Sequence, residues 1–168
     1  MHSKIFQLSP VPVPEDERMS AEDCYDSDLV SYNSDWVGDE ITEPDERKDA
    51  IEGLSELLDG IADVDPDGKV TFRDTAAIAS VFTNWYRQKL SDFLSEMDKG
   101  PARLPSPETT ADKITQFRES KDIFRVDYLH NGNRLDGPFC TSAELVRDAA
   151  CGYNPQVMYV GGIVDYHY

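Results

Sequence analysis

Residues 61–97 read IADVDPDGKVTFRDTAAIASVFTNWYRQKLSDFLSEM. From Ile78 to Met97, apolar residues recur every three or four positions, and Asp74 ahead of them is a favourable N-cap, which predicts a long amphipathic helix. The residues before Asp74 alternate around Asp65-Pro66-Asp67-Gly68, a sequence that suits a type I turn. They predict a β-hairpin with strands over Ile61–Asp65 and Lys69–Arg73. A hairpin followed by a long helix indicates an α+β fold.

The same residues also resemble an EF-hand calcium loop over positions 63–74. Acids stand at loop positions one, three, five and twelve, and Gly68 stands at position six, where such loops turn sharply. Two features depart from the pattern. Position twelve is an aspartate, whose side chain is shorter than that of glutamate and reaches bidentate coordination less easily, and Pro66 makes the backbone at position four rigid. The chain also holds no second copy of the loop. The hairpin is the favoured interpretation, and a calcium site is the alternative, with ligands Asp63, Asp65, Asp67 and Asp74.

The remaining elements follow from local signals on both sides of this stretch. Two strands are predicted, over residues 3–8 and 157–168, and Gly161-Gly162 interrupts the second of them. A second hairpin is predicted over 124–139, with its turn at Asn131-Gly132. The predicted helices begin at Pro44 with Thr42 as cap, at Pro107 with Ser106 as cap, and after the capping box of Thr141 and Glu144. The fold class is therefore α+β, with an antiparallel sheet and hairpins packed against several helices.

The chain is about one domain long, and we expect residues 1–168 to form a single domain. Within it, residues 9–43 form an acidic segment that we expect to be loosely ordered. Pro10, Pro12, Pro14 and the run of acids that follows all oppose regular packing.

Negative charge is concentrated near the N-terminus. Residues 15–49 hold fourteen of the thirty-three carboxylates against three basic residues, a net charge of −11 out of −17 for the whole chain. The electrostatic field of such a charge cluster is informative about binding partners and not about the fold. We expect a basic protein surface as the partner, and net repulsion argues against direct contact with nucleic acid, although Arg118, Lys121, Arg125 and Arg134 could form a small basic patch. The candidate partner-binding residues are Glu15, Asp16, Glu17, Glu22, Asp23, Asp26, Asp28, Asp35, Asp39 and Glu40.

Other classes of function lack their signatures in the sequence. No apolar run reaches the length of a membrane helix, so we expect a cytoplasmic protein that does not enter a membrane. Cys24, Cys140 and Cys151 lack metal-type spacing and are expected to be plain thiols. His2, His130 and His167 are too scattered in sequence to suggest a metal site. With no catalytic triad or phosphate loop, we expect no enzymatic activity and no cofactor, calcium being the alternative.

The order of the segments resembles that of small acidic uncharacterised proteins encoded by gut anaerobes and their mobile elements. The resemblance rests on Ser3–Leu8, on Asp45–Ile51 at the start of the first long helix, and on the hairpin that follows. It implies an accessory protein of a mobile element and brings no catalytic residue with it.

These observations lead to one expected function and two alternatives. The expected function is a non-enzymatic interaction protein whose carboxylates take the place of phosphates on a basic surface, such as the nucleic-acid groove of a host defence enzyme. Inhibitors of the anti-restriction and anti-CRISPR type act in this way. The first alternative is an acidic segment that only keeps the protein soluble. The second is a calcium-binding module with a single loop at 63–74.

Overall fold

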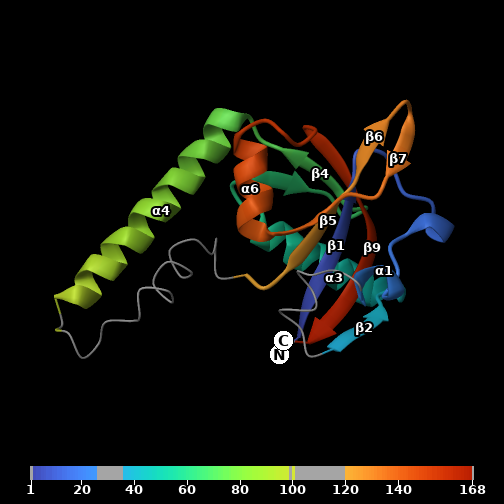
Figure 1. Ribbon diagram of the computed structural model, residues 1–168, viewed down its shortest axis with the longest axis horizontal. Coiled ribbons are helices and arrows are strands. Elements are labelled where there is room, and N and C mark those ends of the chain that lie inside the picture. The colour runs from blue at the N-terminus through green and yellow to red at the C-terminus, as the bar shows by residue number, and fades with distance from the viewer. Residues whose placement is uncertain (1, 26–35, 99, 101–119, 168) are drawn as a thin grey trace.

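The computed structural model describes residues 2–25, 36–98, 100 and 120–167 (Figure 1). They form a seven-stranded sheet with the order β3-β4-β9-β1-β5-β8, in which β2 also pairs with β9, and a separate ribbon of β6 and β7. The strands are β1 (His2–Ser9), β2 (Trp36–Glu40), β3 (Ala62–Val64), β4 (Lys69–Phe72), β5 (Ile123–Val126), β6 (Tyr128–His130), β7 (Asn133–Leu135), β8 (Phe139–Thr141) and β9 (Val157–His167). The helices are α1 (Glu22–Tyr25), α3 (Pro44–Leu57), α4 (Thr75–Met97) and α6 (Ser142–Ala150), and η1 (Glu15–Glu17) is a 3-10 turn.

Strand β9 organises the sheet because it is long enough to pair with three strands. Along one edge its first part pairs with β4 and its last part with β2, and along the other edge it pairs with β1. The pairing with β1 shifts between Phe6 and Leu8, so that Gly161 and Gly162 together lie opposite Gln7. This is a β-bulge, and it accounts for the interruption that the glycine pair predicted.

One face of the sheet carries the main hydrophobic core beneath α3, α6 and the first turns of α4. Helix α3 buries Ala50, Ile51 and Leu54, and α6 buries Leu145, Val146 and Ala149, all in one cluster with sheet residues such as Phe6 and Phe124. Helix α4 buries only Ile78 and then extends away from the sheet (Figure 1). Its later turns expose large apolar side chains, namely Tyr86, Leu90, Leu94 and Met97.

The opposite face of the sheet is covered by part of the acidic segment. Met19 and Cys24 are fully buried there against Ile5, Val164 and Tyr166 of β1 and β9. Helix α1 and strand β2 lie side by side at this edge of the molecule (Figure 1), and the Ala21 amide donates to Glu40 Oε1 over 2.7 Å. The segment therefore packs on the sheet around Met19 and Cys24, and β2 is paired with its edge. Residues 26–35 lie outside the described part of the chain.

The predicted α+β class is confirmed, and the sheet is mostly antiparallel. The exception is β5, which pairs in parallel with β1 although the two strands are far apart in the sequence. No described helix is long and apolar enough to cross a membrane.

The local signals for helices and turns are confirmed with one correction. Asp74 caps α4 by accepting from the Ala77 amide, and Thr141 and Glu144 form the predicted capping box of α6. Asn131 and Gly132 both have positive φ in the turn between β6 and β7. The prediction that Thr42 caps α3 is wrong, because Glu43 occupies the N-cap position and makes no side-chain capping bond. The helix expected from Pro107 to Ser120 falls almost entirely in residues 101–119, outside the described residues.

Candidate functional site

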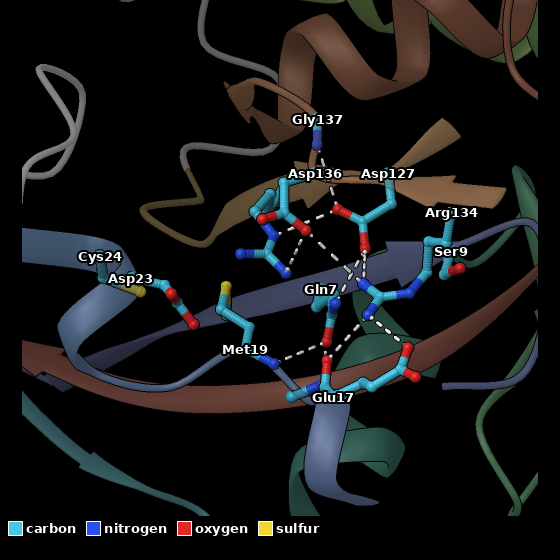
Figure 2. A network of polar contacts seen from close by, with 12 residues as sticks. Gln7, Ser9, Glu17, Met19, Asp23, Cys24, Asp127, Arg134, Asp136 and Gly137 are labelled. Carbon is cyan, nitrogen blue, oxygen red and sulfur yellow. Dashed lines mark hydrogen bonds and ion pairs between the residues drawn. The ribbon is translucent and has the colours of Figure 1, made fainter. Parts of the chain in front are cut away.

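The acidic segment is joined to the sheet by the buried carboxamide of Gln7. Its Oε1 accepts hydrogen bonds from the Met19 amide (2.9 Å) and from the Gly162 amide of the bulge (2.7 Å). Its Nε2 donates to Asp127 Oδ2 over 2.8 Å, as Figure 2 shows. A single side chain of β1 therefore connects the acidic segment, β9 and the residue that follows β5. Both its oxygen and its nitrogen are hydrogen-bonded in a place where unpaired polar atoms would be costly.

Asp127 and Arg134 extend this connection to η1. Asp127 is buried, and its Oδ2 lies 2.7 Å from Arg134 Nη1 while its Oδ1 accepts from the Gly137 amide. Arg134 Nη2 donates to both the carbonyl oxygen and Oε2 of Glu17, each at 3.0 Å (Figure 2). Burial lowers the pKa of Arg134, but the hydrogen bonds to Asp127 and Glu17 outweigh that effect and raise it. The guanidinium is thus a fixed positive charge that holds the acidic segment by its backbone.

The basic patch suggested by the sequence is not present at the arginines that the structure describes. Arg125 is 4% exposed and lies between two carboxylates, with Nε 3.2 Å from Asp127 Oδ1 and Nη2 3.6 Å from Asp136 Oδ1. Arg134 is also enclosed by carboxylates. These two guanidinium groups pair with the buried Asp127 and with the exposed carboxylates of Asp136 and Glu17, so they offer little surface to phosphates. Arg118 lies outside the described residues.

The backbone of the acidic segment comes close to β9 only because the bulge residues lack side chains. A Cβ on Gly162 would overlap the Met19 carbonyl oxygen and would lie 2.7 Å from its amide nitrogen. A Cβ on Gly161 would overlap the Gln7 carboxamide. Beside this contact, burial raises the pKa of the Cys24 thiol to about 12, so it is an inert apolar anchor at neutral pH.

The candidate partner-binding carboxylates all face solvent where the structure describes them. Of the fourteen carboxylates in residues 15–49, Asp26, Asp28 and Asp35 lie outside the described residues, and the other eleven are exposed. Glu17, Asp23 and Glu40 accept hydrogen bonds from their own surroundings. Among the described residues, no side-chain bond engages the carboxylates of Glu15, Asp16, Glu22, Asp39, Glu43, Asp45, Glu46 and Asp49.

The basic residues within 15–49 do little to neutralise those carboxylates. Arg47 points inward from α3, where its Nη2 donates to the Val160 carbonyl over 3.0 Å. Burial and the neighbouring Arg18 charge both lower the pKa of Arg47. Arg18 and Lys48 are exposed, and neither forms an ion pair with a described carboxylate. The surface field of the segment is therefore strongly negative.

The predicted hairpin at 61–73 is confirmed, and three of the four candidate calcium ligands make other contacts in it. Asp63 pairs across the ladder with Thr71 and lies 3.3 Å from Arg73 Nη2. Asp65 instead closes the turn by accepting from the Asp67 and Lys69 amides, and Asp74 is occupied in capping α4. Among the described residues, none of the four belongs to a group of side chains close enough to hold a metal ion.

A group of potential metal ligands that the sequence did not reveal lies where the first and last strands meet. His2, Asp165 and His167 have donor atoms that all lie within 4.8 Å of one another. The sequence showed the histidines as scattered because 165 positions separate His2 from His167. Only the register of β1 against β9 brings them together.

Comparisons of this chain with protein-family models, with curated proteins and with solved structures find no match.

Proposed function

We propose that the protein is a non-enzymatic interaction protein that presents a fixed acidic surface to a basic partner. The observation that carries the proposal is the set of exposed carboxylates on η1, α1 and the end of β2, together with the buried Gln7, Asp127 and Arg134 network that attaches this part of the chain to the sheet. The network holds the backbone of the segment at Met19 and Glu17. Charges held in place lose less entropy on binding than charges on a free tail.

The proposed partner is a protein surface that ordinarily binds nucleic acid. Such surfaces carry Lys and Arg positioned for the regular negative charges of a phosphate backbone. Carboxylates on η1, α1 and the end of β2 supply negative charge without a nucleotide, and a host defence enzyme of the restriction or CRISPR class is the partner type that this chemistry suggests. Charge complementarity of this kind favours fast, salt-sensitive association.

Affinity capture from a bacterial lysate tests this proposal. Four carboxylates without described partners would be neutralised as Glu15→Gln, Asp16→Asn, Glu22→Gln and Asp39→Asn. The matched control removes the same amount of charge elsewhere, as Glu52→Gln, Asp63→Asn, Asp67→Asn and Asp98→Asn. We expect basic nucleic-acid-binding proteins to be retained by the wild type and the control at low salt. They should be lost with the first variant and released by added duplex DNA.

Two results would overturn the proposal. If both variants lose the same proteins, total charge and not this surface is responsible. If the wild type retains no basic protein at any salt concentration, the acidic residues are better explained as a solubilising surface.

A further inference from the structure

We propose that His2, Asp165 and His167 form a binding site for a divalent transition-metal ion of the zinc type. The site is independent of the acidic surface, because it uses other residues, and it differs from the calcium loop in both place and chemistry. Two imidazoles and one carboxylate make a mixed nitrogen and oxygen donor set. This set suits Zn²⁺, Co²⁺, Ni²⁺ or Cu²⁺, whereas Ca²⁺ and Mg²⁺ take oxygen ligands.

The backbone register places all three side chains on one face of the sheet. His2 of β1 lies directly opposite His167 of β9, and Asp165 is two residues before His167 on the same strand. Residues two apart on a strand share a face, and directly paired residues of antiparallel strands have neighbouring side chains. Since β9 is bonded on both sides near this point, by β1 and by β2, the ligands stand on paired backbone and not on a loop.

The distances between donor atoms are close to those of an occupied site. His2 Nδ1 lies 2.8 Å from Asp165 Oδ2, and His167 Nε2 lies 4.0 Å from the same oxygen. The two imidazole centroids are 3.8 Å apart, with a 60° angle between the rings. Ligand atoms around a tetrahedral Zn²⁺ are separated by about 3.3 Å, given metal–ligand bonds of about 2.0–2.1 Å. Small side-chain rotations therefore suffice to place all three donors around one ion.

The exposure of the three side chains leaves the ion an entry path and an open coordination position. The side chain of His2 is 66% exposed, and those of Asp165 and His167 are 28% and 32% exposed. A protein site with three ligands keeps a further position for water or an added ligand. Lys4 opposes binding, because its register partner is Asp165 and its positive charge stands on the same face as His2.

Titration of the tag-free full-length protein with Zn²⁺, followed by calorimetry, tests the site. We expect a single ion per chain, a rise in melting temperature with Zn²⁺, and visible absorption bands typical of nitrogen and oxygen ligands when Co²⁺ is the probe. His2→Gln and His167→Gln should each weaken binding by about tenfold or more, because loss of even an outer-shell partner of a metal ligand typically costs that much affinity. Lys4→Gln should tighten it. An excess of Ca²⁺ should not compete.

The matched control is His130→Gln, which removes an exposed histidine at the end of β6, away from the cluster. Because His2 is at the exposed end of a strand, its replacement leaves the fold intact. Weaker Zn²⁺ binding by His2→Gln therefore reports the loss of a ligand and not unfolding. The proposal is overturned if the wild type shows no saturable Zn²⁺ binding. It is equally overturned if His130→Gln weakens binding as much as His2→Gln, since the ion would then bind histidines anywhere on the surface.

Discussion

At the scale of single residues, the buried polar network determines where the acidic segment lies. Gln7 of β1 bonds Met19, Gly162 and Asp127. Asp127 in turn pairs with Arg134 of β7, and Arg134 bonds Glu17 of η1. A buried ion pair is not in general more stable than a well-packed apolar replacement, but it is costly to break by removing one partner. We infer that this network contributes a specific position for the segment more than it contributes net stability.

Asp127 and Asp136 give a matched pair of substitutions for this inference. Asp127→Ala leaves Arg125 and Arg134 without their buried partner and should lower the free energy of unfolding by about 3–5 kcal/mol. Asp136→Ala removes a carboxylate whose side chain is 73% exposed and which lies 3.6 and 3.7 Å from the same two arginines. Its cost should stay below about 1 kcal/mol. Urea denaturation of both variants measures the difference, and equal losses would contradict the assigned role of Asp127.

At the scale of elements, the β-bulge of β9 is where the acidic segment meets the sheet. Gly162→Ala would place a methyl group against the Met19 backbone, so the segment around Met19 must move away while the rest of β9 remains paired. We expect faster tryptic cleavage after Arg18 in this variant, because the exposed Arg18 precedes Met19.

Gly53→Ala in α3 is the control for this prediction. A Cβ at Gly53 meets nothing within 4 Å, so alanine should stabilise the helix by about 0.5–1 kcal/mol and leave cleavage after Arg18 unchanged. Identical digestion of the wild type and Gly162→Ala would show that the bulge does not hold the segment.

Elements specified by neighbouring residues were predictable, and pairings between distant strands were not. The Asp74 cap, the capping box of Thr141 and the Asn131-Gly132 turn each depend on residues within a few positions, so their signals are complete in the sequence. The parallel pairing of β1 with β5 joins residues 118 positions apart. No local pattern encodes such a choice of partner, because it depends on how the helices and the bulge fill the space around β9.

The same distinction applies to the candidate sites. The exposed carboxylates of residues 15–49 could be listed from composition, but their attachment to Gln7 and Arg134 could not. The motif at 63–74 matched a calcium loop in sequence, yet its turn also suits a hairpin, and a hairpin is what the residues form. The His2, Asp165 and His167 cluster required the register of the two terminal strands.

At the scale of the whole molecule, the charge distribution follows the architecture. The face of the sheet under α3 and α6 holds the main core, while the opposite face is covered by a segment whose exposed charged residues, where the structure describes them, are all acidic except Arg18. We infer that this segment, around Met19 and Cys24, is part of the fold in the free protein. A free tail of the same composition would repel itself and extend into solvent.

Amide hydrogen exchange of the isolated protein tests that claim most directly. The Met19 amide donates to a buried oxygen of Gln7, and the Gly162 amide donates to the same oxygen. We predict that both exchange far more slowly than in an unfolded chain, and that protection at Met19 is lost in Gly162→Ala. Exchange at Met19 as fast as in an unfolded chain, with Gly162 still protected, would show that the acidic segment is a free tail and would contradict the account.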